Sequence, residues 1–300
     1  MPELARSLTP ASLSVDLLSG RSHAPRHHHK PLYRAVLVDA AGTFLIPSEP
    51  VSDVYLRYAK PAGCTLGHKE VLHRFRRAYN MPWSHSPLRY VGDARPFWSF
   101  IVRESTGCSE PEVHEAIYEY YARAEAWHVA PGAVDQLRRL KDAGLLLAVV
   151  SNFDTRLRPI LRQLGVEGLF DEVVVSAEVC AEKPNPVIFD AALRSLSAAA
   201  VARGTASALP FAAAAAASPA AAAAARAASA ICASLPPPRD FRPLAPEQVV
   251  HIGDDRRNDC WGARAAGMTA WLWGADVHSW GEVADRVLHG ERDEEEEEEE

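Results

Sequence analysis

An α/β fold with a parallel sheet as its core is the fold class that this sequence predicts. From about Ala130 onward, apolar strand-like runs alternate with helix-like segments. The run LLLAVVSN is continuously apolar, as is typical of a strand that is buried on both faces of a parallel sheet. Residues 48–128 instead show helical spacing and few strand signals. The sequence therefore predicts an α/β core that is interrupted by an inserted helical domain.

The individual strands and helices follow in order along the chain. The first strand is the apolar run that ends at Asp39, within YRAVLVDAAGTFL. The inserted helices lie in SDVYLRYAKPAG, KEVLHRFRRAYN and PEVHEAIYEYYARAEAW, where apolar residues recur three and four positions apart. The helix PGAVDQLRRLKDAG starts with a proline and stops at a glycine, which favour those two ends. After LLLAVVSN, the helices RLRPILRQLG, PNPVIFDAALRSL and RNDCWGARAAG alternate with the strands DEVVVSAE, QVVHIGDD and TAWLW.

These elements define the expected domain boundaries. The core comprises residues 33–47 and 129–290, and the inserted helical domain comprises residues 48–128. Residues 197–245 are expected to be a low-complexity, Ala/Pro-rich insertion, because a connection in a compact domain usually needs only about 4–6 residues. Residues 1–32 are predicted to be a disordered N-terminal extension or a targeting segment, and residues 291–300 an acidic tail.

Charge and cysteine content restrict the classes of partner and location. The formal net charge is −7, of which the acidic residues Asp293 to Glu300 supply −8, so the rest of the chain carries +1. We therefore expect no nucleic-acid partner, and no segment predicts a membrane span. The five cysteines are odd in number and form no CxxC pair, which favours an intracellular location, in cytoplasm, nucleus or an organelle. The sequence predicts no particular oligomeric state.

Polar residues gather where the predicted strands end. The set is Asp39, Ser151 with Asn152, Lys183, and Asp254 with Asp255. Taken singly, each could be a helix cap, a turn residue or a solvated side chain. Ligands of parallel α/β sheets, however, bind outside the carboxyl ends of the strands. The order Asp…Ser…Lys…GDDxxxD along one sheet edge therefore indicates a single functional site.

This order, with its flanking patterns, strongly resembles the haloacid dehalogenase (HAD) superfamily of aspartyl hydrolases and phosphatases. The segments DAAGT, VSNFDTRLRPIL, EKPNPVIF and GDDRRNDCWGARAAG are most similar to the subgroup called haloacid dehalogenase-like hydrolase domain-containing protein 3, including its plant-type members. The resemblance covers Tyr33 to Trp273 except for the insertion. It implies a Rossmann-like core and identifies residues 48–128 as the cap domain of that superfamily.

The resemblance also implies roles for the site residues. Asp39 would be the nucleophile that forms an aspartyl phosphate, and Lys183 would neutralise the phosphoryl oxygens. The substrate would be a small phosphorylated metabolite. The residues expected to contact it are Ser151, Asn152, Gly42 and Thr43.

A magnesium ion is the cofactor that the resemblance implies. Asp39, Asp254 and the backbone carbonyl of Ala41 would bind Mg²⁺. Asp255 or Asp259 would hold its water molecules or orient Lys183. The residues expected at the metal are thus Asp39, Ala41, Asp254, Asp255 and Asp259.

Ala41 departs from the phosphatase pattern. The phosphatases of the superfamily place a second Asp there, which acts as general acid and base. Without it, alkyl phosphates should be poor substrates, whereas aryl or acyl phosphates should suffer less. Three alternatives to a phosphatase stay open: a weak or inactive binding protein, a 2-haloacid dehalogenase, and a phosphonate hydrolase that uses Lys60 or Lys69 as a Schiff base.

Overall fold

The computed structural model describes residues 32–83, 86, 88–207 and 243–290. Residues 1–31 of the predicted N-terminal extension, residues 208–242 of the predicted insertion and the acidic tail lie outside these ranges. None of the helices within the described ranges is long and apolar enough to cross a membrane.

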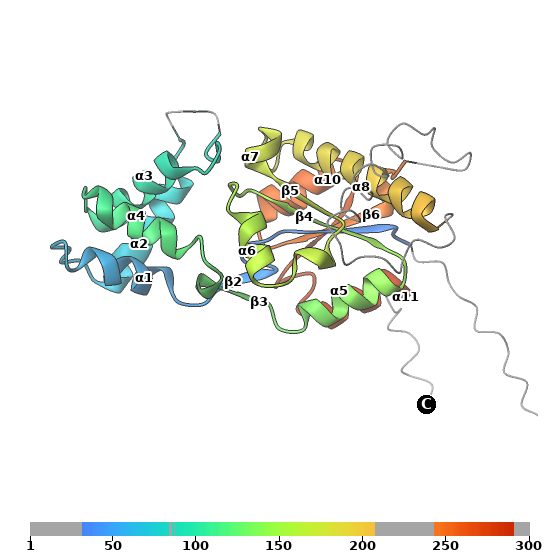
Figure 1. Ribbon diagram of the computed structural model, residues 1–300, viewed down its shortest axis with the longest axis horizontal. Helices are drawn as coiled ribbons and strands as arrows, with labels where there is room; N and C mark the ends of the chain where they lie inside the picture. Colours follow the sequence, from blue (N-terminus) through green and yellow to red (C-terminus); the bar gives the residue numbers. More distant parts are fainter. Residues whose placement is uncertain (1–31, 84–85, 87, 208–242, 291–300) are drawn as a thin grey trace, which may run out of the picture. The chain divides into compact units, whose positions relative to one another are not determined.

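A five-stranded sheet forms the core, and all its neighbouring strands are parallel (Figure 1). The strand order is β5-β4-β1-β6-β7. The strands are β1 (Ala35–Val38), β4 (Leu146–Ser151), β5 (Glu172–Val175), β6 (Val249–Gly253) and β7 (Thr269–Leu272). After β1, the chain adds β4 and β5 on one side of it and then β6 and β7 on the other side. The predicted α/β fold with a parallel sheet is confirmed, and the strand order reverses beside β1, where such sheets bind ligands.

Helices cover both faces of the sheet. Val36 and Val38 of β1 join one apolar cluster, whereas Ala35 and Leu37 join another, because successive residues of a strand point to opposite faces. The first face packs against α5 (Ala133–Asp142), α6 (Leu157–Gln163) and α11 (Trp280–His289). The second packs against α8 (Pro186–Ser207) and α10 (Gly262–Ala265). Burial on both faces explains why the strands are continuously apolar.

The inserted helices of residues 48–128, which we call the cap, have a core of their own. The cap helices are α1 (Val51–Ala59), α2 (His68–Asn80), α3 (Arg95–Thr106) and α4 (Pro111–Tyr120). Buried apolar residues of the helices form one cluster; it includes Tyr55, Phe97, Ile101, Val113 and Ile117. Phe97 and Ile101 lie four positions apart, as do Val113 and Ile117, so the two residues of each pair lie on one helix face. The predicted helical spacing therefore corresponds to the faces that the cap helices turn toward one another.

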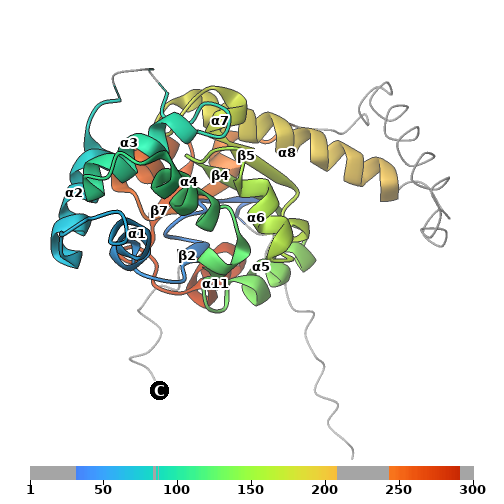
Figure 2. The same ribbon diagram turned by 60° about the vertical axis from the view of Figure 1, so that its left-hand side comes forward.

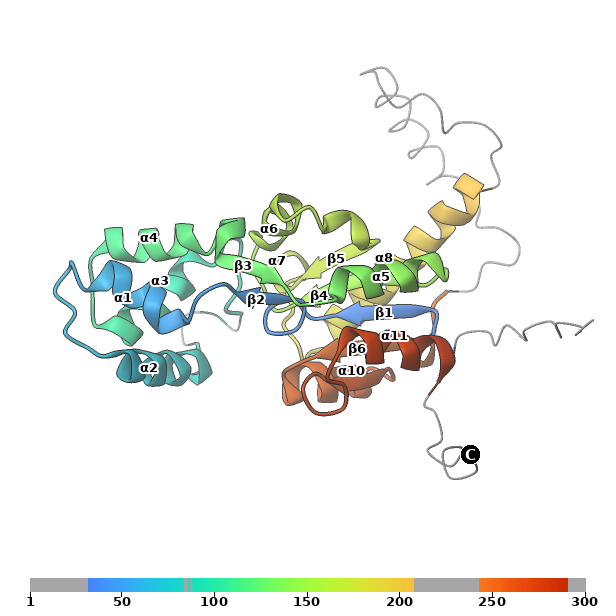
Figure 3. The same ribbon diagram turned by 90° about the horizontal axis from the view of Figure 1, so that it is seen from below.

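Two short strands join the cap to the core. β2 (Leu45–Pro47) leads into the cap, and β3 (Trp127–Val129) leads out of it. They pair antiparallel with Leu45 opposite Val129, so the two crossings lie side by side (Figure 3). The sequence analysis does not predict this pair, because three residues are too few to show an alternation of apolar and polar side chains.

Helix α8 is longer than predicted. The sequence analysis starts the insertion at residue 197, but α8 continues to Ser207 and runs beyond the edge of the sheet (Figure 2). The physical reason is the alanine content of this stretch, since alanine is the best helix former. At the other boundary, Leu244 is buried against the second face of the sheet. Both ends of the predicted insertion therefore belong to the core.

Candidate active site

The central strand and its two neighbours carry the first site residues to one edge of the sheet. Asp39 directly follows β1, Ser151 ends β4, and Asp254 directly follows β6. The Asp39 backbone N–H donates to the Ile252 carbonyl at 2.8 Å, which extends the β1–β6 ladder by one residue. Because β4 and β6 flank β1, Ser151 and Asp254 lie on either side of Asp39.

Asp39 is a buried carboxylate with one oxygen occupied. Its Oδ1 accepts hydrogen bonds from Ser151 Oγ at 3.0 Å and from Lys183 Nζ at 2.6 Å. Its Oδ2 accepts no hydrogen bond from the described part of the chain. Burial raises the pKa of Asp39 to about 6; Lys183 opposes this shift, and the charges of Asp259 and Asp254 add to it. Oδ2 is therefore the oxygen that is free to react or to bind a cation.

Lys183 lies at the centre of the site. Its ammonium donates to Asp39 Oδ1 and Asp259 Oδ1, both at 2.6 Å, and to the Val150 carbonyl at 2.8 Å. An ammonium has three N–H groups, so each of them is used. Burial disfavours the charge, but Asp259 and Asp39 outweigh burial and keep the pKa of Lys183 above its ordinary value. The lysine is therefore a fixed cation beside Asp39.

Asn152 fixes the segment that carries Lys183. Its Nδ2 donates to the Lys183 carbonyl at 3.0 Å, and its Oδ1 accepts from the Lys183 backbone N–H at 2.6 Å. Our assignment of Asn152 as a substrate contact stays a prediction; in the structure its amide also holds the backbone of Lys183. It therefore acts on the site by positioning the lysine.

Asp259 and His251 form a buried pair behind Lys183. Asp259 Oδ1 also bonds to His251 Nε2 at 2.9 Å, and its Oδ2 accepts from the Asp255 backbone N–H at 3.0 Å. Burial works against the charge of Asp259, but Lys183 and His251 outweigh burial and hold its pKa well below its usual range. Since an ionised carboxylate can only accept, His251 Nε2 carries the proton. Of the alternatives Asp255 and Asp259, the structure therefore places Asp259 against Lys183.

His251 was missed by the sequence analysis. It lies within β6, is fully buried, and packs edge-to-face against Phe189. Its Nδ1 is buried and has no hydrogen-bond partner in the described ranges. The available signal was a single titratable residue inside the apolar run VVHIG.

The placement of Asp255 at the metal is corrected. Its side chain accepts from the backbone N–H groups of Arg257 and Asn258, both at 2.8 Å, and so caps the π-helix η4 (Arg256–Trp261). Carboxylates favour this position because they satisfy N–H groups that have no partner within the helix. The Asp255 carboxylate is absent from the group formed by Asp39, Asp254 and Asp259.

Gly42 and Thr43 lie against Asp254. Gly42 has a φ of +99°, and a Cβ on it would stand 2.4 Å from Asp254 Oδ2. Only glycine fits, since any other side chain would displace that carboxylate. Thr43 is fully buried, and its Oγ1 donates to Asp254 Oδ1 at 3.5 Å. Their assignment as substrate contacts stays a prediction; in the structure both residues also lie against the Asp254 carboxylate.

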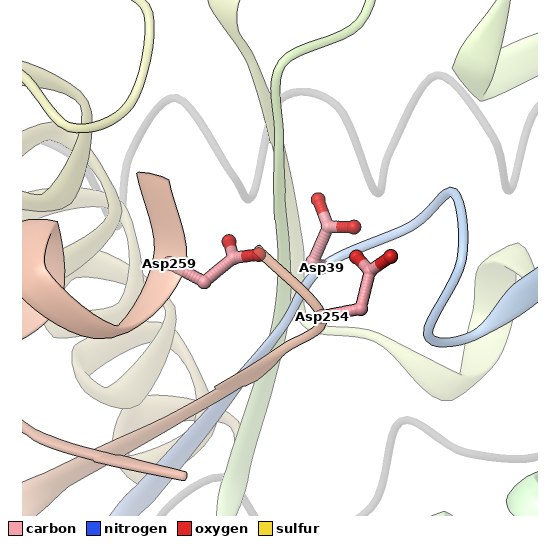
Figure 4. A group of neighbouring side chains, drawn as sticks. All are labelled: Asp39, Asp254 and Asp259. Carbon is pink, nitrogen blue, oxygen red and sulfur yellow. The ribbon is translucent and has the colours of Figure 1, made fainter. Parts of the chain in front are cut away.

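Three carboxylates form a candidate cation site. Oxygen atoms of Asp39, Asp254 and Asp259 lie within 4.8 Å of one another (Figure 4). Asp254 keeps part of its surface in solvent, yet neighbouring groups displace enough water to raise its pKa, and the charge of Asp259 adds to the shift. The charge of Lys183, which contacts Asp39 and Asp259, offsets only part of their negative charge. The all-oxygen donor set and the excess negative charge fit a hard divalent cation such as Mg²⁺.

A cavity of about 300 Å³ opens next to this group. Ala41, Gly42 and Asn152 line it from the core. Aromatic rings supply most of the remaining wall; they include Phe75, Tyr79, Trp98, Tyr121, Trp127 and Phe153. The cavity therefore connects the sheet edge to the cap.

Two acidic side chains of the core are among those that contact the cap. Asp154 Oδ2 accepts from Trp98 Nε1 at 2.9 Å. The Glu182 carboxylate accepts from the backbone N–H of Arg89 and, at 3.3 Å, from that of Tyr90. Glu182 directly precedes Lys183, so a cap contact and the site lysine lie next to each other in the chain.

The family follows from comparison with known proteins. A family model described as haloacid dehalogenase-like hydrolase matches residues 33–206, which is more than half of the chain. The chain belongs to the haloacid dehalogenase-like hydrolase family. A second HAD-hydrolase-like model matches residues 180–292 of this HAD-like chain. The resemblance read from the sequence is thereby confirmed.

Two curated relatives of this HAD-like chain share one name. The human protein called haloacid dehalogenase-like hydrolase domain-containing protein 3 is 32% identical over 177 residues, which cover 55% of this chain and 70% of that protein. The Xenopus laevis protein of the same name is 27% identical over 252 residues, covering 80% of this chain and 83% of that protein.

Solved structures share the fold. A HAD phosphatase from Thermococcus onnurineus has a TM-score of 0.52 at 21% identity, and the match covers 87% of this chain and all (100%) of that one. The putative HAD-hydrolase YfnB from Bacillus subtilis, solved bound to magnesium, has a TM-score of 0.54 at 14% identity, covering 82% of this chain and 90% of that one. These similarities support the HAD-like α/β fold alone.

Proposed function

We propose that this HAD-like protein is a magnesium-dependent hydrolase that removes a phosphoryl group from a small substrate and lacks the usual general acid. The observation that carries the proposal is the environment of Asp39. One carboxylate oxygen is held by Ser151 and Lys183, and the other accepts no hydrogen bond from the described residues. A nucleophile needs this combination of a fixed orientation and an unblocked atom.

The reaction follows from the free oxygen. Asp39 Oδ2 attacks phosphorus, the bond from phosphorus to the leaving-group oxygen breaks, and an aspartyl phosphate forms. Water then attacks phosphorus and regenerates the Asp39 carboxylate. Lys183 reduces the repulsion between Asp39 and the phosphoryl oxygens, since it is a buried cation in contact with Asp39. Asp259 and Asn152 keep Lys183 in place.

The cation would be held by Asp39, Asp254 and the Ala41 carbonyl, with Asp259 contacting its water molecules. Bound Mg²⁺ supplies positive charge that neutralises the transferring phosphoryl group. The oxygen donor set supports this assignment, as does the presence of magnesium in the YfnB structure.

Ala41 restricts the substrates to those with acidic leaving groups. A methyl group stands where the phosphatases of the superfamily carry an acid, so the leaving-group oxygen departs as an anion and takes its proton from water. The structure does not favour the phosphonate alternative. Lys60 and Lys69 are both exposed, and neither lines the cavity, whereas a Schiff-base lysine needs a desolvated setting.

Asp39→Asn should abolish hydrolysis, because an amide cannot form the aspartyl phosphate. The test is steady-state hydrolysis of 4-nitrophenyl phosphate, acetyl phosphate, glycerol 3-phosphate and 2-haloacids, with Mg²⁺ and with EDTA. We expect magnesium-dependent turnover of the first two phosphates. Asp135→Asn is the matched control, since Asp135 is an exposed residue of α5. Turnover of a haloacid alone would assign the protein to dehalogenation, and no turnover of any compound would favour a binding protein.

Magnesium affinity should depend on pH through Asp39. Its pKa in the metal-free protein is raised to about 6, so below that pH the carboxyl holds a proton that Mg²⁺ has to displace. We expect Kd to rise about tenfold for each pH unit below 6 and to be nearly constant above pH 7. Titration calorimetry in buffers of different ionisation enthalpy should show release of nearly one proton at pH 5 and almost none at pH 7.5. A Kd that is constant from pH 5 to 7.5 would contradict this assignment.

A further inference from the structure

The cavity beside Ala41 is specialised for one class of leaving group. We infer that the substrate is an aryl phosphate monoester whose leaving group is an uncharged, apolar aromatic ring seated in this cavity. The inference rests on the proposed function, and it specifies the substrate class of that same site.

The cavity wall is aromatic and preformed. Rings from α2, α3 and α4 meet rings from the core around a volume of about 300 Å³. Phe75 stacks on Tyr79 with ring centroids 5.9 Å apart, and it meets Tyr55 edge-to-face at 5.7 Å. Aromatic rings pair favourably in such geometries, by about 0.5–1.5 kcal/mol beyond area burial. A planar aromatic ligand would join an existing set of ring contacts.

Arg156 is a charged side chain in the wall, and it is already paired with a carboxylate. Arg156 donates to both carboxylate oxygens of Asp154, at 2.8 and 2.7 Å, and to the Tyr118 carbonyl at 3.0 Å. Asp154 is fully buried, so this bidentate pair is screened little by solvent. The guanidinium also lies over the Tyr118 ring, 3.8 Å from its centroid. A leaving group with a carboxylate would therefore lose its hydration without gaining a free cation.

Most polar atoms of the rings are also in use. The Tyr79 and Tyr90 hydroxyls bond to each other at 2.6 Å, Tyr118 donates to the Asp93 carbonyl at 2.9 Å, and Trp98 donates to Asp154. The Tyr121 hydroxyl is buried and has no hydrogen-bond partner among the described residues. Desolvating a polar group without a partner is costly, so a sugar with several hydroxyls is a poor occupant. The Tyr121 hydroxyl could therefore accept or donate one hydrogen bond to an occupant.

Ala41 supplies an independent argument for the same leaving group. Ala41 and Gly42 line the cavity and lie two and three residues after Asp39, so a group in the cavity departs next to a methyl. Without a proton donor, the leaving oxygen has to be stable as an anion. An aryl oxide meets this requirement far better than an alkoxide does. A small acyl phosphate satisfies the chemistry but leaves the aromatic wall empty, and a sugar phosphate satisfies neither condition.

The first step balances without any further reactant. Asp39 Oδ2 gives an electron pair to phosphorus, and the bond from phosphorus to the aryl oxygen breaks with its pair on oxygen. The aryl oxide then takes a proton from water as it leaves. In the second step a water oxygen attacks phosphorus, the bond from phosphorus to Asp39 Oδ2 breaks with its pair on Oδ2, and inorganic phosphate leaves. One water is consumed for each phenol and phosphate formed.

The test compares phosphate esters whose leaving groups have similar acidity. We expect kcat/KM to fall in the order 2-naphthyl, phenyl and 4-carboxyphenyl phosphate, with at least about a tenfold difference between the first and the last. Phe75→Leu should lower the ratio of kcat/KM for 2-naphthyl phosphate to that for acetyl phosphate by about tenfold. Phe100→Leu is the matched control. Phe100 is a half-buried ring of the same cap that lies outside this cavity. The ratio of the two kcat/KM values in Phe100→Leu should therefore equal the ratio in the parent protein.

Binding provides a readout without turnover. Asp39→Asn with Mg²⁺ should bind 2-naphthyl phosphate about tenfold more tightly than 4-carboxyphenyl phosphate in titration calorimetry. Equal kcat/KM for the three aryl esters, or a preference for the carboxylated ester, would overturn the inference and leave the proposed function intact. If neither acetyl nor 4-nitrophenyl phosphate were hydrolysed, the proposed function would fail, and the inference about the substrate would fail with it.

Discussion

Asp259→Asn should destabilise the metal-free protein by about 3–5 kcal/mol, whereas Asp254→Asn should leave its stability unchanged or higher. Asp259 is 1% exposed and accepts hydrogen bonds from Lys183 and His251. An amide would leave Lys183 buried with one fewer carboxylate, and breaking a buried ion pair by removing one partner is strongly destabilising. Among the described residues, Asp254 has no such cationic partner at bonding distance, and its pKa is raised, so loss of its charge relieves repulsion.

The two variants should rank in the opposite order in how much they weaken Mg²⁺ binding. Asp254→Asn should weaken Mg²⁺ binding more, because the oxygens of Asp259 already accept from Lys183, His251 and the Asp255 backbone. Urea unfolding in EDTA measures the first ranking, and calorimetric titration of the folded variants measures the second. Parallel losses of stability in both variants would contradict the division of roles between these two carboxylates.

Ala41→Asp should raise the hydrolysis of alkyl phosphates by about 10²- to 10⁴-fold, the usual contribution of general acid–base catalysis. Residue 41 is exposed and lines the cavity, so a carboxyl group can be added there without displacing core atoms. The gain should be smaller for aryl phosphates, whose leaving oxygen needs a proton less. A new carboxylate near Asp39 and Asp254 adds negative charge, so the gain should require Mg²⁺.

Two further variants isolate the proton transfer. Ala41→Asn has nearly the same shape but no titratable proton, so it should show no gain. Asp39→Asn combined with Ala41→Asp should be inactive, which would show that the gain uses the same nucleophile. Steady-state rates for glycerol 3-phosphate and phenyl phosphate measure all these variants. An unchanged rate in Ala41→Asp, at a concentration where Mg²⁺ binds, would mean that more than a proton donor is missing.

The positions of Asp39, Ser151 and Asp254 at one edge were predictable from the sequence. Each follows or ends an apolar run, and the carboxyl ends of parallel strands meet at the same edge of a sheet. Lys183 was also singled out from the sequence, just beyond a predicted strand, but its contact with Asp39 was harder to foresee, because it lies in the connection between β5 and α8 and not at a strand end.

The functions of neighbouring acids were harder to predict. Asp255 and Asp259 are four positions apart in GDDRRND, and composition does not reveal which of them turns inward. The π-helix determines which carboxylate turns inward, because Asp255 caps its first turn while Asp259 reaches Lys183. His251 was hidden because a residue of a continuously apolar strand has no distinctive spacing. Gly42 was assigned to the substrate, since the sequence gives no sign of the Asp254 carboxylate that forbids a Cβ.

The β2–β3 pair has a consequence for how proteins of this kind diversify. Pro47 and Trp127 face each other across the pair, so the chain leaves the core and returns to it at one place. Recombination between these two points would exchange the whole cap, with its own apolar cluster, without shifting the register of the central sheet. A lineage could thus acquire a new leaving-group cavity in one genetic event and keep its Asp39 chemistry. After such an exchange, selection would need to rebuild the contacts that Asp154 and Glu182 make with the cap.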